Sequence, residues 1–264
     1  MKIIAIIVIK NEGDIISATL DNAIRWADKI VVLDNGSSDN SWEIVNNSPS
    51  SKVIPFERDE GPYSDGFRAR IFEAFKDEMT DSDWWVIQDG DEHYLDNPRE
   101  FIQNNEIAGH FVLGNKLDVY PKDYTEIGFN PSNFVKAANY TWSEPRLIRH
   151  RPGMVWSEKE IWPKPMGIQD KARIRIKHYP CRNKRQMEKR WKDRRASLER
   201  NGQYFNHWNL ESWEDMLPGL KELIDLDPSN LDVHYDFQKI MNYQKQAFWK
   251  VLLYHLGFRL GLIK

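Results

Sequence analysis

The sequence predicts an α/β fold built on a doubly wound, mostly parallel sheet. Two features of the first hundred residues predict it: short apolar runs alternate with segments of helical spacing, and polar segments follow several of those runs. Strands that alternate with helices form parallel sheets, and right-handed crossovers pack the helices against the sheet. Ligands bind beyond the carboxyl ends of the strands in such sheets, so the polar segments mark the expected site.

The first hundred residues contain four expected strands and three expected helices. The strands are expected at 3–9, 30–33, 53–56 and 84–88. Helical spacing follows the first strand, a short helix follows Asp39, and a longer helix covers about 64–78. The opening run is short, lacks a small-residue cleavage site and ends abruptly at Lys10, so we interpret it as a buried strand and not as a signal peptide. No stretch reaches the ~20 apolar residues of a membrane span.

The rest of the sequence divides into a less regular middle and a helical C-terminal part. Strands are expected at 110–113, 116–120, 146–149 and 173–178, between loops rich in Pro, Gly and Trp that suit an acceptor-binding surface. From residue 183 the pattern is helical, and it ends in a helix over 243–262. We therefore expect a ligand-binding domain over 1–180 and a helical extension over 181–264.

The composition limits the classes of partner and compartment. The chain has 264 residues, 41% of them apolar, which is enough for the core of one medium α/β domain with an extension. Its net charge of −3 gives no reason to expect nucleic acid as a partner. The one cysteine, Cys181, cannot form an internal disulfide, which favours a reducing compartment and so the cytoplasm.

The segment Asp89-Gly90-Asp91 is the most informative of the polar segments. It follows an apolar strand, so both carboxylates are expected to project into the crevice at the strand ends. Hard divalent cations such as Mn²⁺ or Mg²⁺ prefer oxygen ligands, which carboxylates and phosphate oxygens supply. Alone, an Asp-Gly-Asp sequence also fits a surface turn. Its place behind two earlier polar strand ends, 10–12 and 34–36, favours a site for a cation and a diphosphate.

Four segments occur in a fixed order in the first 95 residues. They are Val8-Ile9-Lys10-Asn11-Glu12, the run from Ile30 to Asp39, Gly66-Phe67-Arg68-Ala69-Arg70, and the run from Trp85 to Glu92. Each segment is common alone, but together, in this order and spacing, they resemble the family 2 glycosyltransferases. The resemblance implies a GT-A fold, a nucleotide-diphosphate-sugar donor, a divalent metal and inversion at the anomeric carbon. Asn35 departs from the family pattern, which usually has a second aspartate at that place.

The resemblance also implies roles for individual side chains. Val8 and Lys10 would line the pocket for the base, and Asp34 would accept a hydrogen bond from the base. Arg68 would lie beside the donor phosphates, where a permanently charged fork is useful. In the aspartate motif, the first carboxylate (Asp89) would face the ribose or the metal, and the second (Asp91) would be a metal ligand.

The third metal ligand and the catalytic base are expected after the aspartate motif. His178 ends the strand at 173–178, where several metal-dependent relatives carry a histidine that completes the coordination of the cation. A lone histidine is more often structural. Inverting transfer needs a carboxylate to deprotonate the acceptor hydroxyl. Related enzymes carry this base between the aspartate motif and the histidine; Glu160 is the first candidate, Glu158 the second and Glu144 the third, and spacing alone does not separate them.

Two C-terminal segments leave several partners open. The basic run at 182–200 suits a cover for the donor diphosphate, a site for an anionic acceptor, a lipid surface or a solvated helix face. The final helix at 243–262 combines aromatic and aliphatic residues with a few cations. That pattern suits a peripheral membrane contact, packing onto the core, or contact with a second subunit in an oligomer.

These observations rank three functions. The first is an inverting, metal-dependent glycosyltransferase that uses a hydroxyl of a glycan or glycolipid as acceptor. The second is a sugar-phosphate nucleotidyltransferase, which shares the layered architecture; that class carries a glycine-rich phosphate loop near its first strand, and the segment 10–13 is not one. The third is a non-catalytic carbohydrate-binding protein, which has no need of Asp89, Asp91 and His178. The donor sugar, its base and the acceptor do not follow from the fold.

Overall fold

The structure is a computed structural model that describes residues 1–125, 128–138, 142–201, 211–217, 223–226, 241–242, 249, 252–253, 256–257 and 260. The strands are β1 (Ile3–Ile9), β2 (Lys29–Asp34), β3 (Val53–Arg58), β4 (Trp84–Ile87), β5 (Glu92–Tyr94), β6 (Phe111–Pro121), β7 (Phe134–Ala138), β8 (Trp142–Arg149), β9 (Gln169–His178), β10 (Leu223–Asp225) and β11 (Met241–Asn242). The α-helices are α1 (Ile16–Ile24), α2 (Ser41–Asn46), α3 (Phe67–Phe75), α4 (Pro98–Asn104) and α5 (Lys184–Asn201).

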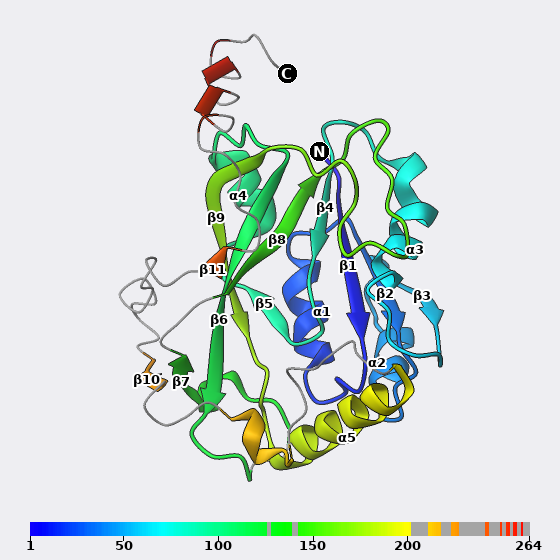
Figure 1. Ribbon diagram of the computed structural model, residues 1–264, viewed down its shortest axis with the longest axis vertical. Coiled ribbons are helices and arrows are strands. Elements are labelled where there is room, and N and C mark those ends of the chain that lie inside the picture. Colours follow the sequence, from blue (N-terminus) through cyan, green and yellow to red (C-terminus); the bar gives the residue numbers. More distant parts are fainter. Residues whose placement is uncertain are drawn as a thin grey trace.

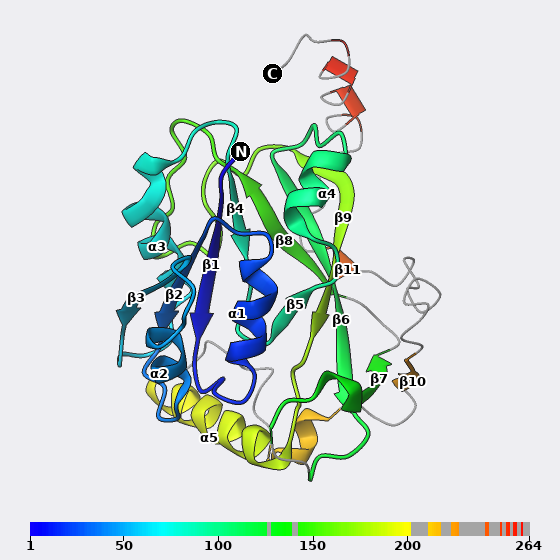
Figure 2. The same ribbon diagram turned by 180° about the vertical axis from the view of Figure 1, so that it is seen from behind.

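The first four strands form the parallel part of the sheet, in the order β4-β1-β2-β3. They correspond to the four strands expected in the first hundred residues, and the expected helix at 64–78 is the shorter α3. Because the strands run in the same direction, their carboxyl ends lie at one edge of the sheet. In Figures 1 and 2, α5 crosses this edge below the arrowheads of β1 and β2.

The second half of the sheet differs from the mostly parallel arrangement that the sequence predicts. β8 is antiparallel to both β4 and β6, and β7 is antiparallel to β6. β6 also pairs with β9 in parallel, so it is the common partner of three strands. The two strands expected at 110–113 and 116–120 are this one long strand, because the polar residues between them remain in register with β8 and β9. The fold is therefore a mixed α/β sheet with a parallel core.

Helices cover both faces of the parallel core, and β1 shows why. Its odd-numbered residues, including Ile3 and Ile7, pack with α1 and Trp26, whereas Ile4 and Ile6 pack with α3 on the other side. Side chains alternate between the faces of a strand, so a continuous apolar run is what a strand buried on both faces requires. Figure 2 shows α1 running alongside β1.

The C-terminal part is described only as far as its first helix and a few short stretches. α5 confirms a helix after residue 183. The expected helix at 243–262 lies mostly outside the described residues, as does most of the extension predicted over 181–264. Among the residues that the structure describes, none of the helices has the length and apolar content needed to cross a bilayer.

Candidate active site

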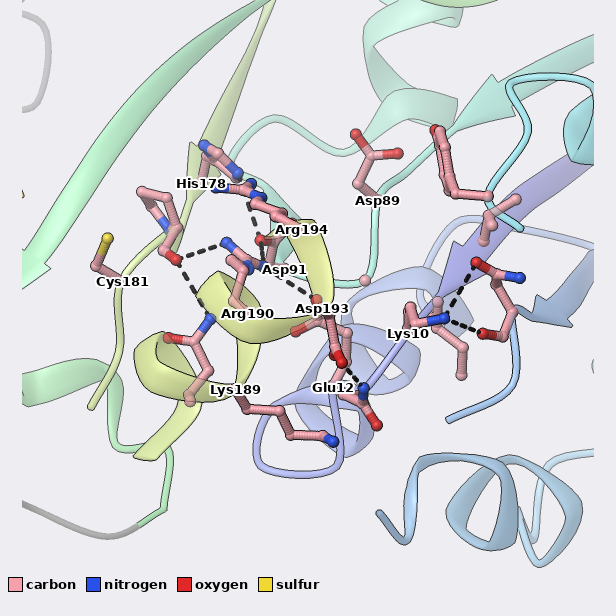
Figure 3. Close-up of a pocket in the computed structure, with 18 of the residues that line it drawn as sticks. Lys10, Glu12, Asp89, Asp91, His178, Cys181, Lys189, Arg190, Asp193 and Arg194 are labelled. Carbon is pink, nitrogen blue, oxygen red and sulfur yellow. Dashed lines mark hydrogen bonds and ion pairs between the residues drawn. The ribbon is translucent and has the colours of Figure 1, made fainter. Parts of the chain in front are cut away.

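A cavity of about 860 Å³ lies at the carboxyl ends of the parallel strands. The ends of β1 and β4 form one wall, and β6, the end of β9 and α5 form the others. Six of the residues predicted for the site line this cavity: Val8, Lys10, Arg68, Asp89, Asp91 and His178. Figure 3 shows Asp91 and His178 pointing toward each other, with α5 beside them. The topology therefore brings together side chains that are up to 170 residues apart in the sequence.

Asp89 is held by two arginines from different elements. Its Oδ1 lies 2.6 Å from Nη2 of Arg68 on α3, and its Oδ2 lies 3.0 Å from Nη2 of Arg146 on β8. Burial opposes ionisation of Asp89, but the two guanidinium groups hold its pKa well below the usual range. Asp89 is therefore a fixed negative group at the cavity wall, and Arg68 lies beside it.

Arg146 is the centre of a buried charge cluster behind Asp89. Its Nη2 also lies 2.6 Å from Glu92 and 2.7 Å from Glu144. Lys116 on β6 pairs with Glu144 at 2.6 Å and with Glu92 at 3.4 Å. Asp89, Glu92 and Glu144 have oxygens within 4.8 Å of one another, a spacing that a cation could bridge. In this structure the guanidinium of Arg146 contacts all three carboxylates, so the protein itself neutralises them.

Asp91 has a different set of partners, all of which come from residues 178–190, later in the chain. Its Oδ2 lies 2.6 Å from Nη2 of Arg190 and 3.5 Å from Nε2 of His178, and Nη1 of Arg182 is 3.9 Å away. The Asp91 side chain is 8% exposed. Burial opposes its charge, but His178 and Arg190 hold its pKa well below the usual range.

His178 is oriented by a second carboxylate. Its Nδ1 lies 2.7 Å from Oδ1 of Asp118 on β6, which leaves Nε2 facing Asp91. Burial favours the neutral ring, but Asp91 and Asp118 outweigh it and raise the pKa of His178 to about 10. A carboxylate on one ring nitrogen is the usual support of a metal-binding histidine.

The pair of Asp91 and His178 has a separation that suits a shared divalent cation. Neighbouring ligands of an octahedral cation at about 2.1 Å are roughly 3 Å apart. Nε2 of His178 and Oδ2 of Asp91 are 3.5 Å apart, and both line the cavity. The donor set of carboxylate oxygen and imidazole nitrogen fits Mn²⁺ or Mg²⁺ when the His178 ring is neutral.

A second carboxylate–arginine network, which was not predicted from the sequence, lies beside Asp91. Glu12, at the end of β1, lies 2.5 Å from Arg182 and 3.0 Å from Arg190, and Arg182 also binds Asp14 at 2.8 Å. The polar strand end at 10–12 and the basic run at 182–200 were the available signals. Nothing in the local sequence indicates that these two segments, about 170 residues apart, are in contact.

Residues 4–99 match the sequence model of the family described as "Glycosyl transferase family 2". These residues are a family 2 glycosyltransferase domain. The resemblance inferred from the four sequence segments is thereby confirmed for this part of the chain. Asp89 and Asp91 lie inside the matched part, whereas Arg146, His178 and α5 lie outside it. A comparison with curated protein sequences finds no match.

Solved structures of several glycosyltransferases are similar to the chain at low identity. The structure of S. aureus TarS 1-349 in complex with UDP is 16% identical with a TM-score of 0.34 over 48% of this chain and 40% of that chain. The mannosyltransferase PcManGT from Pyrobaculum calidifontis in complex with GDP-Man and Mn²⁺ is 18% identical, with a TM-score of 0.32 over 42% and 34%. The aligned part thus spans less than half of either relative, and TM-scores this low support no conclusion about ligands.

Lys10 and Asp34, both predicted to contact the nucleobase of the donor, occupy different places within this glycosyltransferase domain. Lys10 lines the cavity and donates from Nζ to the backbone oxygen of Asn35 at 2.9 Å. The Asp34 side chain is fully buried and does not line the cavity; it accepts hydrogen bonds from the Ser37 backbone and hydroxyl and lies 3.5 Å from Arg58. In this conformation Asp34 fixes the turn after β2.

The candidate bases lie outside the cavity lining. Glu160 is 40% exposed and pairs with Lys164, whereas Glu158 pairs with Arg70 on α3. Their loop is packed tightly against the start of α3, since a Cβ on Gly66 would come within 2.3 Å of the Glu158 carbonyl oxygen. Glu144 is engaged by Arg146 and Lys116. Asp65, which is not among the residues predicted for the site, does line the cavity.

We predict that Arg146→Met destabilises the protein by about 3–5 kcal/mol, because it leaves the buried carboxylate of Glu92 and its neighbours without their shared partner. Urea unfolding followed by circular dichroism measures the change. Arg146→Lys is the matched control, because it keeps the positive charge and loses only the fork. Equal losses in the two variants would show that neutralisation of the carboxylates is not what Arg146 contributes.

Proposed function

We propose that the chain is an inverting glycosyltransferase of the GT-A type, which transfers a sugar from a nucleotide-diphosphate donor to a hydroxyl of a glycan or glycolipid. The observation that carries the proposal is the meeting of Asp89, Asp91 and His178 at one cavity, beyond the strand ends of a family 2 glycosyltransferase domain. The volume of about 860 Å³ suits a nucleotide sugar.

In this proposal the donor lies along the part of the cavity wall that Val8, Lys10 and Arg68 form. In this proposal Val8 and Lys10 contact the base and Arg68 lies by the phosphates, since all three line the cavity. Asp34 reaches the base only if the turn that it binds through Ser37 rearranges. Asp89 faces the ribose or the cation, and its two arginine partners hold it in place.

Asp91 and His178 would hold the divalent cation. Asp118 keeps the Nε2 atom of His178 aimed at Asp91, so both ligands face the same point of the cavity. Bound there, Mn²⁺ or Mg²⁺ would supply neutralisation of the charge that develops on the leaving nucleoside diphosphate.

The catalytic base is the carboxylate that has to reach the acceptor hydroxyl. We keep Glu160 as the first candidate and Glu158 as the second, on the loop packed against α3. Either residue must break its ion pair, with Lys164 or with Arg70, to reach an acceptor in the cavity. Asp65 is the alternative that the structure adds, because it already lines the cavity.

We expect the protein to bind a nucleoside diphosphate tightly only when a divalent cation is present. In Asp91→Asn the affinity should be low, and it should be the same with and without the cation. The reason is that a neutral amide oxygen is a much weaker ligand for a hard cation than a carboxylate. Thermal shift and calorimetry with UDP and GDP, with Mn²⁺ or with chelator, measure the effect. Asp81→Asn, on an exposed turn, is the control. The cation site would be contradicted if three samples had the same nucleotide affinity: the wild type with Mn²⁺, the wild type with chelator, and Asp91→Asn with Mn²⁺.

For the base, we predict that Glu160→Gln lowers transfer by roughly 10²- to 10⁴-fold and leaves nucleotide and Mn²⁺ affinity unchanged. A loss confined to turnover marks an interaction made in the transition state. Steady-state transfer assays on Glu160→Gln, Glu158→Gln and Asp65→Asn assign the role to whichever variant shows this pattern. Full activity of Glu160→Gln would remove it from the mechanism.

The C-terminal segment suggests where an acceptor glycolipid would be met. Five of its described residues are large, apolar and 44–69% exposed: Trp249, Leu252, Leu253, Leu256 and Leu260. Residues 241–264 contain four Lys or Arg and neither Asp nor Glu. We propose that this segment contacts an anionic lipid surface, since exposed apolar side chains in a sequence that carries cations and no acids match acyl chains below phosphate headgroups.

Co-sedimentation with vesicles tests this contact. The full chain should sediment with vesicles that contain anionic phospholipid and much less with zwitterionic vesicles. The double variant Leu253→Asp/Leu256→Asp should sediment with neither kind of vesicle. Both leucines are exposed, so the variant keeps its folded core. Unchanged vesicle binding by the variant would refute the proposal, and a change only in oligomeric state, seen by light scattering, would assign the segment to a second subunit.

A further inference from the structure

Arg190 occupies the position that a cation bound to Asp91 would need. Its Nη2 lies 2.6 Å from Oδ2 of Asp91, the same oxygen that faces Nε2 of His178. The same nitrogen lies 3.0 Å from Oε1 of Glu12, and Nη1 donates to the backbone oxygen of Pro180 at 2.6 Å. Figure 3 shows this guanidinium extending from α5 to Asp91.

A divalent cation and this guanidinium compete for the same carboxylate oxygen. Both are positive, and like charges a few ångströms apart in a buried site repel strongly. Asp91 and Arg190 both line the cavity, so they are open to the same ligand. Cation binding at Asp91 therefore favours departure of Arg190.

The contacts of Arg190 allow it to leave, whereas those of Arg182 do not. The Arg182 side chain is fully buried and is held by Glu12, by both oxygens of Asp14 and by the backbone oxygen of Tyr179. The Arg190 side chain is 16% exposed and lines the open cavity. When Arg190 moves, Glu12 keeps Arg182 at 2.5 Å, so no buried carboxylate is left unpaired.

Other side chains of α5 hold the helix in place beside the cavity through hydrogen bonds of their own. Nζ of Lys189 donates to Oγ of Ser38 at 2.6 Å, and Oδ2 of Asp193 accepts from Nδ2 of Asn11 at 2.7 Å. These contacts flank Arg190 on the same helix. A rotation of the Arg190 side chain is therefore enough, and α5 can stay in place while it happens.

We propose that Arg190 is a displaceable counter-charge: it neutralises Asp91 in the empty enzyme, is displaced by the divalent cation, and then pairs with the diphosphate of the donor. The proposal rests on the proposed function. The released guanidinium remains at the wall of the same cavity, and its planar fork matches phosphate oxygens. Arg190 is in this view a donor-positioning residue that the cation sets free.

The test is a pair of affinities measured by calorimetry on the full chain. Without nucleotide, Arg190→Gln should bind Mn²⁺ roughly tenfold more tightly than the wild type, because no charge-assisted contact has to be broken. At saturating Mn²⁺, the same variant should bind UDP or GDP more weakly by a similar factor. Lys189→Gln is the matched control: it removes one positive charge from the adjacent position of the same helix and cavity, without a contact to Asp91.

The outcomes separate this proposal from the cation site itself. Equal gains in Mn²⁺ affinity for Arg190→Gln and Lys189→Gln, or no gain, overturn displacement and leave the cation site standing if Asp91→Asn loses Mn²⁺ binding. Undiminished Mn²⁺ binding by Asp91→Asn overturns both. Arg190→Lys, which keeps the charge and loses the fork, provides a second variant should Arg190→Gln not fold, and it should show a smaller gain of the same sign.

Discussion

Buried ion pairs between carboxylates at the strand ends and arginines from later in the chain are the constraint on which this structure depends. Burying an unpaired charge costs several kcal/mol, so a carboxylate at the floor of a cavity needs a partner that is also positioned by the fold. Arg146 serves Asp89, Glu92 and Glu144, and Arg182 with Arg190 serves Glu12 and Asp91. The two clusters fix the positions of the carboxylates at the wall of the cavity.

The order of the two clusters follows from the sheet. The parallel strands β1 and β4 deliver Glu12 and Asp89–Asp91 to one edge, whereas antiparallel β8 runs back past β4 and places Arg146 beneath that edge. β6 then carries Lys116 to one cluster and Asp118 to the other; the two residues are two positions apart, so their side chains lie on the same face of the strand. The mixed sheet is therefore a condition for the charge balance, and a wholly parallel one would not present these partners together.

Sequence patterns predicted the parallel core well because its signals are local. Apolar runs such as 3–9 and 84–88 are strands, and polar residues directly after them, including Lys10, Asp89 and Asp91, line the cavity. The antiparallel half was not predicted, since pairing direction depends on contacts between distant segments. Arg146 and Arg190 were not predicted for the same reason. The local sequence around an arginine does not show whether its side chain faces solvent or a distant carboxylate, and Asp91 is 99 residues away from Arg190.

The contacts of α5 bear on the order in which the chain can complete its fold during synthesis. The predicted division at residue 180 separates Glu12 and Asp91 from Arg182 and Arg190, yet these four form one network. A nascent chain that has exposed only its first 180 residues holds all the strands of the parallel core but lacks both of those arginines. Domains usually fold as units as they emerge from the ribosome. We therefore expect the edge of the sheet at Glu12 and Asp91 to become fully paired only after α5 has been translated.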